Sequence, residues 1–506
     1  MDKKNNKQSL DVLFNPTSVA IYEAKQNISF FLKGFKRQNF NFEKIYLVSP
    51  KLEELSGLKC YKTFDNIPED TIDLLILSVR RELLIESLKN ILSKKKVLLI
   101  HIFTAGTGEF DDKGIEIESQ IKKILDNYIY TRAIGPNCMG LYSPRGRTAY
   151  YPSFPVERGN IGLIFQSGDL HSKMIKFGSR RYDLRFSVGI SIGNCIDIQI
   201  SEILEYLNKD DETDVICVYF EGISPFHKNE GKILFSVLKQ MRISPFHKNE
   251  GKILFNVLKQ MRKPVLFMRG GRTKRGQSAI LTHTGSLATK SNIWEAIYKQ
   301  TPCIEVPPSL DDLIDYAYLL SSYIARFKKE KKEIIYPEDK RALVILWSGG
   351  FGILATDTLT ELGLKLPYFE GKTLEKLKEV YPIKIGSLSN PFDLPWIIHQ
   401  KVFVDVCKAG IDENIDLVIF ETDSWKDLEG DAFKAYYKNL LELRNHVECL
   451  NKTFIIILHQ YPSQSQGIFN NMLIKDKFIV YPTIETAAKS FLKLYEYGKK
   501  LNRLYT

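Results

Sequence analysis

Short apolar runs alternate with amphipathic stretches along the first part of the chain. The apolar runs lie at 19–22, 45–48, 74–78, 97–103 and 132–134. Amphipathic segments such as 81–92 and 113–128 separate them. Apolar strands that alternate with helices are typical of a parallel, doubly wound sheet, whose ligand binds at the carboxyl ends of the strands. We therefore predict an α/β domain over residues 1–148.

A second alternating pattern predicts another α/β domain over residues 149–324. Its expected strands lie at 162–165, 186–191, 214–220 and 264–267. The first of them leads into QSGDLHSKMIKFG, which predicts a tight turn into a helix. The backbone N–H groups at such a helix start could hold a phosphate near Ser167 and Gly168. A plain strand-to-helix turn is the alternative.

A charged segment at 325–340 predicts a linker, and a third α/β domain is expected over 341–506. Expected strands of this domain lie at 342–347, 417–420, 453–458 and 478–480. The first is followed by SGGFG and a helix, so Gly350 and Gly352 mark a second possible anion-binding helix start. The turn-rich SNPFDLP at 389–395 could line a cleft or be an ordinary loop.

Residues 223–242 and 243–262 are a tandem duplication that differs only at Ser236 and Asn256. Each copy carries a proline, a polar turn and an amphipathic helix pattern. A period of 20 residues that occurs twice does not predict a solenoid. Because the strands at 214–220 and 264–267 need only one crossover helix between them, the second copy is expected to be surplus.

The segment MRGGRTKRGQSAILTHTGSLATK at 268–290 surrounds His283 with glycines, hydroxyls and positive charges. This setting favours an imidazole nucleophile that takes a phosphoryl group, and an ordinary surface histidine is the alternative. Glu221 follows the strand at 214–220, where it could orient such an imidazole or simply cap a helix. These two residues are the candidate catalytic pair.

Net charge, cysteine content and hydropathy limit which partners and metal sites are expected. The 506 residues carry a formal net charge of +11, but the lysines are spread along the chain and no nucleic-acid motif occurs, so no nucleic-acid partner is expected. The seven cysteines form no CxxC pair, which argues against a zinc site and for a reducing compartment. No apolar run approaches the ~18 residues of a membrane span. We expect a soluble cytoplasmic protein without a metal site of its own.

Several motifs occur in one order along the chain: GPNCMG, FQSGD, YFEGI, GGRT, THTGSLA, SGGFGILATD and SNPFDL. With this set the chain resembles the alpha subunit of nucleoside-diphosphate-forming acyl-CoA synthetases, such as ADP-forming acetate–CoA ligase, in the succinyl-CoA synthetase superfamily. The resemblance implies a CoA-binding Rossmann-like domain and two flavodoxin-like domains with parallel sheets. It also implies interconversion of acyl-CoA, ADP and phosphate with a carboxylic acid, ATP and CoA, by way of an acyl phosphate and a phosphohistidine.

The resemblance assigns roles to residues. His283 would be phosphorylated and Glu221 would steady it, while the helix starts at Ser167–Gly168 and at Gly350 and Gly352 would face the phosphohistidine. Coenzyme A, as substrate, would contact Ala24, Lys25, Val79 and Asn137. A separate ATP-grasp beta subunit would hold ATP or ADP with Mg²⁺, so a hetero-oligomer is expected.

One departure from the family pattern concerns the first turn. Where the family has Gly-Ala-Ser, this chain has Glu23, Ala24 and Lys25. A carboxylate at the glycine position repels phosphate and hinders a close backbone approach, which Lys25 could partly offset. The alternative function is therefore a non-catalytic or degenerate CoA- or nucleotide-binding regulatory protein of the same fold.

Overall fold

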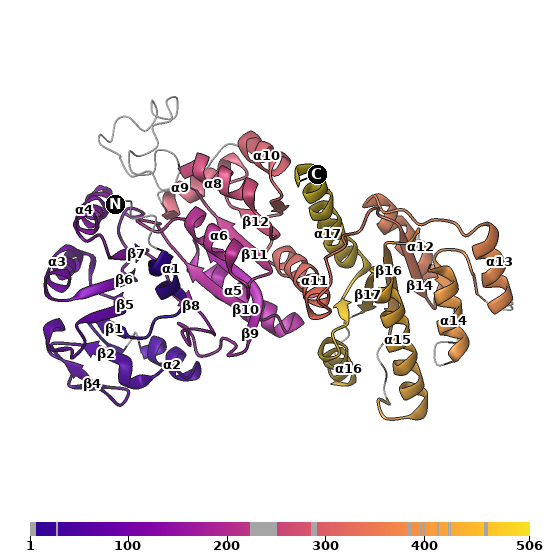
Figure 1. Ribbon diagram of the computed structural model, residues 1–506, viewed down its shortest axis with the longest axis horizontal. Helices are drawn as coiled ribbons and strands as arrows, with labels where there is room; N and C mark the ends of the chain where they lie inside the picture. The colour runs from indigo at the N-terminus through magenta and orange to yellow at the C-terminus, as the bar shows by residue number, and fades with distance from the viewer. Residues whose placement is uncertain are drawn as a thin grey trace. The chain divides into compact units, whose positions relative to one another are not determined.

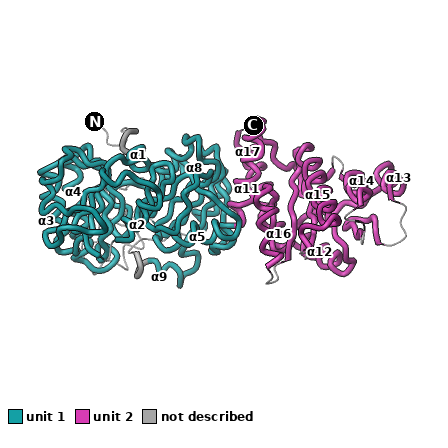
Figure 2. Tube along the Cα trace, turned by 90° about the horizontal axis from the view of Figure 1, so that it is seen from below, with its two compact units in different colours: residues 1–314 teal, residues 315–506 magenta. Residues whose placement is uncertain are grey.

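The computed structural model describes residues 7–26, 29–222, 250–284, 291–381, 386–394, 397, 400–411, 414–423, 425, 427–459 and 464–505; at 7–9, 250 and 281–284 it describes the backbone only. The chain divides into two compact units, residues 1–314 and residues 315–506 (Figure 2). Both are α/β, with mostly parallel sheets, as the sequence predicts.

The first sheet of unit 1 has the strand order β3-β4-β2-β1-β5-β6-β7 (Figure 1). Its pairs are parallel except for the β3–β4 hairpin, and Val19 lies opposite both Ile45 and Leu74. The strands are β1 Val19–Tyr22, β2 Ile45–Val48, β3 Glu54–Leu55, β4 Leu58–Tyr61, β5 Thr71–Leu77, β6 Lys96–Ile102 and β7 Arg132–Ile134. The accompanying helices are α1 Lys7–Phe14, α2 Ser29–Arg37, α3 Leu84–Lys94 and α4 Asp112–Asn127.

The second sheet of unit 1 has the order β13-β12-β11-β9-β10-β8. Its strands are β8 Gly140–Tyr142, β9 Arg158–Phe165, β10 Phe186–Ser191, β11 Val215–Phe220, β12 Val265–Arg269 and β13 Ile304–Val306. Its helices are α5 Gly168–Tyr182, α6 Ile200–Lys209, α8 Glu250–Gln260, α9 Lys274–Thr284 and α10 Ser291–Gln300. The first two expected domains thus share one compact unit, and β8, from the range expected for the first domain, pairs antiparallel with β10.

The crossover between β11 and β12 is made by α8, the helix of the second duplicated copy. Its apolar side chains Leu254, Val257 and Leu258 are buried, and it packs beside α6. The first copy, 223–242, lies outside the described residues. The second copy therefore supplies a helix that packs on the sheet with its apolar side chains buried.

Unit 2 contains a five-stranded sheet with the order β15-β14-β16-β17-β18. Its strands are β14 Ala342–Leu346, β15 Phe392–Asp393, β16 Leu417–Thr422, β17 Thr453–Leu458 and β18 Ile479–Tyr481. Its helices are α12 Gly349–Glu361, α13 Gly371–Val380, α14 Lys401–Gly410, α15 Asp431–Cys449, α16 Gln464–Lys475 and α17 Ile484–Tyr505. All its strand pairs are parallel.

The charged segment 325–340 begins inside a helix. Helix α11 (Leu310–Lys329) includes its first five residues, and within unit 2 the Tyr318 hydroxyl donates to the Phe478 carbonyl oxygen (2.9 Å). Further along the segment, the ring of Tyr336 packs edge-on against Tyr497 of α17. Charge alone suggested a plain linker, but these aromatic contacts attach it to unit 2.

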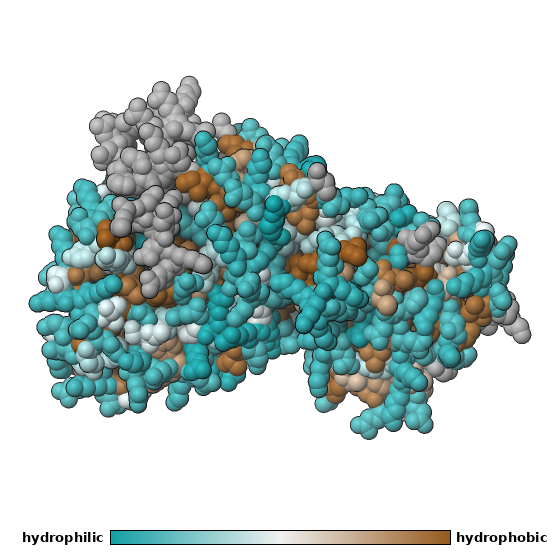
Figure 3. Space-filling view, viewed as in Figure 1, coloured by the Kyte–Doolittle hydropathy of each residue, from teal (hydrophilic) through white to brown (hydrophobic). Residues whose placement is uncertain are grey.

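The face shown in Figure 3 is mainly hydrophilic, with small scattered apolar areas. Among the described residues, no helix is both long and apolar enough to cross a membrane.

We predict that deleting residues 243–262 leaves the melting temperature unchanged within about 4 °C. The retained copy differs from the deleted one only at Ser236, so it can form the same crossover helix as α8. Shortening the connection changes its closure entropy by roughly 0.6 kcal/mol per halving of length, which moves the midpoint by a few degrees at most. Differential scanning calorimetry of both chains measures this. A drop of more than about 10 °C would show that both copies stabilise the fold.

Candidate functional site

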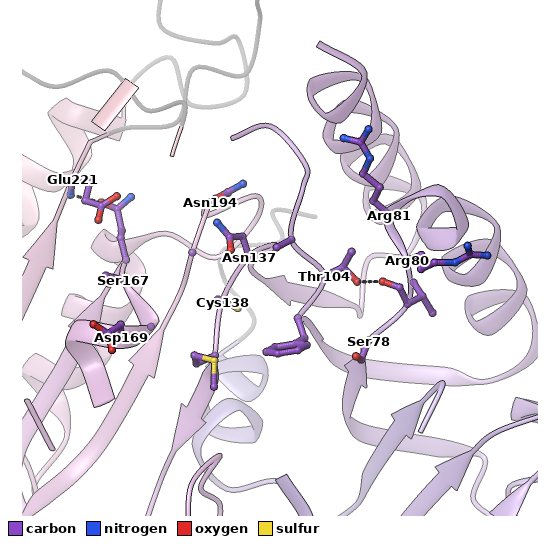
Figure 4. A pocket seen from close by; sticks show the side chains of 17 residues that line it. Ser78, Arg80, Arg81, Thr104, Asn137, Cys138, Ser167, Asp169, Asn194 and Glu221 are labelled. Atoms are coloured by element: carbon purple, nitrogen blue, oxygen red, sulfur yellow. Dashed lines mark hydrogen bonds between the residues drawn. The ribbon is translucent and has the colours of Figure 1, made fainter. Parts of the chain in front are cut away.

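A pocket of about 530 Å³ lies in unit 1, where the carboxyl ends of strands from both sheets meet (Figure 4). From the first sheet come the residues after β5, β6 and β7, and from the second sheet those after β9, β10 and β11. The lining residues are Ser78, Val79, Arg80, Arg81, Phe103, Thr104, Ala105, Asn137, Cys138, Met139, Gln166, Ser167, Gly168, Asp169, Gly193, Asn194 and Glu221. Five predicted site residues are therefore brought together: Val79, Asn137, Ser167, Gly168 and Glu221.

The predicted helix start at Ser167 and Gly168 lies at this pocket. Ser167 is the N-cap of α5, and its Oγ accepts a hydrogen bond from the Leu170 N–H (3.3 Å). A Cβ on Gly168 would lie 2.5 Å from the Met139 side chain, so the close packing there requires glycine. The N–H groups of the first turn have no partner within the helix and make an anion-binding site. The negative charge of Asp169 in this turn is offset by Lys173 (2.7 Å).

Gln166 fixes the segment that carries Glu221. Its Oε1 accepts hydrogen bonds from the backbone N–H groups of Glu221 (2.5 Å) and Gly222 (3.2 Å), and its Nε2 donates to the Gly222 carbonyl oxygen (2.9 Å). The Glu221 residue is only 7% exposed. Burial, with the neighbouring Glu221 carboxylate, raises the pKa of Tyr219. Gln166 was not among the predicted site residues, although it stands in the FQSGD motif.

Residues after β5, β6 and β7 form the other wall of the pocket. The Thr104 hydroxyl donates to the Val79 carbonyl oxygen (2.8 Å; Figure 4), and the Thr104 carbonyl accepts from the Asn137 N–H (2.9 Å). Asn137 has a left-handed φ of 59°. Arg81 is held by Asp111 (3.0 Å), whereas Arg80 is exposed beside the pocket. Arg80 is thus a positive charge that sequence reasoning did not single out.

Asn194 connects the pocket to two acidic side chains, the buried Glu118 and the partly buried Glu109. Its Nδ2 donates to Glu109 Oε2 (2.7 Å) and to Glu118 Oε1 (2.8 Å). Burial raises the pKa of Glu118, and the charge of Glu109 raises it further, while hydrogen bonds from Asn194 and Thr107 oppose the shift. This network holds the loop after β10 against the first sheet. No signal in a single sequence pointed to it, because it joins residues 85 positions apart.

The predicted CoA-binding residues Ala24 and Lys25 are not among the lining residues of this pocket. Ala24 is buried, and its N–H donates to the Val48 carbonyl oxygen (2.9 Å). Glu23 has a left-handed φ of 59°, the conformation that favours glycine, and its carboxylate lies 3.6 Å from Lys25 Nζ. The turn in which this chain departs from the Gly-Ala-Ser pattern of the family therefore carries a carboxylate at the glycine position, and Lys25 partly neutralises its charge.

His283 belongs to the last turn of α9 (Lys274–Thr284) rather than to a glycine-rich loop, because the glycines Gly270 and Gly271 precede the helix. Its side chain and residues 285–290 lie outside the described residues. Whether it lies near Glu221 stays a prediction.

The second predicted helix start belongs to α12 in unit 2, with Ser348 as N-cap. Gly350 lies in the first turn, where N–H groups have no partner within the helix. The N–H of Gly352, in contrast, donates to the Ser348 carbonyl oxygen (3.0 Å) and is not available to an anion. Among the described residues, no cluster of three or more His, Cys, Asp or Glu is placed to hold a metal ion.

Comparisons with known proteins agree with this architecture. Residues 33–144 match the model of a CoA binding domain, and residues 158–241 and 248–320 match that of a succinyl-CoA ligase like flavodoxin domain. The alpha subunit of Pyrococcus furiosus acetate–CoA ligase (ADP-forming) II is 28% identical over 413 residues, which is 81% of each chain. The acetate–CoA ligase (ADP-forming) of Methanocaldococcus jannaschii is 32% identical over 384 residues, but this chain covers only 48% of its length.

A solved structure shows the same fold. The dinucleotide forming acetyl-coenzyme A synthetase 1 of Ca. Korarchaeum cryptofilum, in complex with phosphate and ADP, superposes with a TM-score of 0.76 over 98% of both chains at 23% identity. The matches to both domain models, to ligase alpha subunits and to this fold confirm the resemblance read from the motifs. The chain is therefore similar to the alpha subunits of nucleoside-diphosphate-forming acyl-CoA synthetases, and it matches both a CoA binding domain and a succinyl-CoA ligase like flavodoxin domain.

Proposed function

We propose that the chain is the alpha subunit of an ADP-forming acyl-CoA synthetase, which interconverts acyl-CoA, ADP and phosphate with a carboxylic acid, ATP and CoA. The observation that carries this proposal is the pocket in unit 1. It brings the strand ends of a CoA-binding type of domain against the N-terminus of α5 and the buried Glu221. A thioester, a phosphate and a histidine-orienting carboxylate would meet at such a place.

Each site residue has a separate role in the proposed reaction. Phosphate held by the N–H groups at Gly168 attacks the thioester carbonyl, the C–S bond breaks, and CoA leaves as a thiolate. An imidazole nitrogen of His283 then attacks phosphorus, the O–P bond of the acyl phosphate breaks, and the carboxylate leaves. Glu221 accepts the other imidazole N–H and orients the ring. Val79, Asn137 and the exposed Arg80 border the thioester end of the pocket, while Ala24 and Lys25 lie in the turn that would face the CoA phosphates.

The phosphoryl group must then reach ADP. We propose that an ATP-grasp beta subunit holds the nucleotide with Mg²⁺ and that the two chains form a hetero-oligomer. The similarity to relatives that are named as alpha subunits, such as that of Pyrococcus furiosus acetate–CoA ligase (ADP-forming) II, supports this. The helix start at Gly350 would serve the phosphorylated histidine as a second anion-binding position.

One observation favours the second candidate, a CoA-binding regulatory protein without turnover. Glu23 occupies a left-handed turn position with a carboxylate, only partly neutralised by Lys25. Backbone N–H groups approach a phosphate more closely when the turn residue is glycine. Phosphorylation of His283 distinguishes the two candidates, since the regulatory protein does not need it.

We predict that the chain incubated with acetyl-CoA and radiolabelled phosphate acquires an acid-labile label on His283. His283→Ala should abolish the label. Glu221→Gln keeps the size of the side chain and removes its charge, so it should slow labelling by about 10- to 100-fold, as for other groups that orient a reacting histidine. Labelling is followed by filter binding and located by mass spectrometry at neutral pH.

His171→Gln serves as a control for the label, because this buried histidine bonds Tyr150 and lies outside the pocket lining. Melting curves show whether each variant is folded. Label that persists in folded His283→Ala would refute the assignment of His283. If the wild-type chain acquires no label from acetyl-CoA and phosphate, and none when acetyl phosphate is supplied directly, the regulatory protein is favoured.

We predict that Glu23→Gly binds CoA several-fold more tightly than the wild-type chain. The substitution removes a carboxylate from the expected phosphate-facing turn and places glycine in a left-handed conformation that suits it. Isothermal titration calorimetry with CoA measures the change.

Lys25→Gln is the matched variant, because it leaves the Glu23 carboxylate without its neutralising ammonium group. It should weaken CoA binding in the wild-type background and have less effect beside Glu23→Gly. Equal affinity in all four chains would show that CoA does not use this turn.

A further inference from the structure

The sheet of unit 2 repeats the strand order of the second sheet in unit 1. The order β15-β14-β16-β17-β18 corresponds to β10-β9-β11-β12-β13. In both sheets the second of these strands, β14 or β9, is followed by a turn and the glycine-containing start of a helix, α12 or α5. By this correspondence β16 matches β11, the strand before Glu221, and β17 matches β12, the strand that leads toward His283.

These two strands of unit 2 carry a carboxylate and an imidazole in direct contact. Glu421 lies in β16, His459 follows β17, and His459 Nε2 is 3.2 Å from Glu421 Oε1. Glu421 is 4% exposed, and among the described residues its Oε2 has no hydrogen-bond partner. Burial raises the pKa of Glu421, and the adjacent imidazole opposes that shift. Among the described residues, the hydrogen bond to His459 therefore offsets the cost of burying the Glu421 carboxylate.

This contact decides which nitrogen of His459 can react. A carboxylate only accepts hydrogen bonds, so Nε2 carries the proton and Nδ1 keeps its lone pair. No group in the described part of the chain bonds Nδ1. Gln466 donates to the carbonyl oxygen of His459 and fixes the backbone at this point. An imidazole held by a carboxylate through one nitrogen, with the other nitrogen open, is the arrangement of an activated nucleophile.

His459 lies at a small pocket that α12 and the start of α17 border. The imidazole packs against Phe351 in the first turn of α12, with ring centroids 4.7 Å apart. It also lines a pocket of about 220 Å³ together with Thr358 and with Thr483, Ile484 and Glu485 at the start of α17. Helix starts present N–H groups and positive dipole ends to such a pocket. The negative charge of Glu485 is offset by Lys489 (2.5 Å).

We propose that His459 is a second phosphoryl-accepting histidine, located in unit 2 and phosphorylated on Nδ1 by an acyl phosphate. The Nδ1 lone pair attacks phosphorus, the O–P bond breaks, and the carboxylate leaves with the electron pair. The proton on Nε2 stays in the hydrogen bond to Glu421, which offsets the positive charge on the ring. Glu421 is the positioning residue of this pair.

The experiment exposes the full chain to acetyl phosphate and, in parallel, to phosphoramidate, a small donor that phosphorylates nucleophilic imidazoles without an enzyme. Phosphohistidines are located by mass spectrometry at neutral pH. His446 in α15 is the reference, since it is a histidine of the same unit outside the pocket. His459 should be labelled at least about 10-fold faster than His446, and Glu421→Gln should remove this advantage. Labelling of His459 at the rate of His446, or a rate unchanged by Glu421→Gln, would overturn the proposal.

A spectroscopic readout separates positioning from mere packing. In chains with ¹⁵N-labelled histidine, the ring nitrogens of His459 should show the Nε2–H tautomer, and Glu421→Gln should give a mixture of tautomers. If Glu421→Gln does not fold, the comparison of His459 with His446 in the wild-type chain decides. The label on His283, scored in the same samples, tests the proposed function separately, because the two histidines are resolved by mass.

Discussion

Backbone hydrogen bonds between residues 133–137 and 192–198 hold the two sheets of unit 1 edge to edge. The Ile196 N–H donates to the Gly135 carbonyl (3.0 Å), and the Asn194 N–H donates to the Pro136 carbonyl (3.0 Å). Beside them the buried Arg132 pairs with Asp197 (2.8 Å) and Glu202 (3.0 Å). Removing one partner of such a buried pair leaves an uncompensated charge, which costs roughly 3–5 kcal/mol. This seam fixes the distance between the strand ends that line the pocket.

Three polar residues at the pocket, Gln166, Asn194 and Glu221, are buried, and a buried polar group needs a hydrogen-bond partner. Gln166 accepts a hydrogen bond from the backbone N–H that follows β11, and Asn194 donates hydrogen bonds to two acidic side chains beside the first sheet. Because these partners come from different strands, the hydrogen bonds that satisfy them also determine where Glu221 and the start of α5 lie. In unit 2, the buried Glu421 carboxylate near the end of β16 is likewise hydrogen-bonded by a residue from another strand end, the imidazole of His459 after β17.

The chain tolerates two unusual sequence features because each is accommodated locally. Glu23 takes a conformation that favours glycine, and Lys25, two residues along the chain, balances its charge. The duplication adds residues to a connection between adjacent parallel strands, and α8 from the second copy packs beside α6. Neither feature disturbs the hydrogen bonds between strands, since β1 and β11 keep regular parallel pairing on both sides.

The sequence by itself determined the α/β class, most strands and the two glycine-containing helix starts, because apolar periodicity and turn residues act locally. The motifs and the family resemblance also named Val79, Asn137, Ser167, Gly168 and Glu221 as site residues, and these five line one pocket. Only the tertiary structure shows that Ala24 and Lys25 are not among the residues that line this pocket. It also shows that the Gly352 N–H is hydrogen-bonded within α12, and that the first two expected domains form one compact unit. It also revealed Gln166, Asn194 and the Glu421–His459 pair. Their partners are 38 to 85 residues away in the chain, and contacts at that separation depend on how strands are ordered in a sheet, which a single sequence does not encode locally.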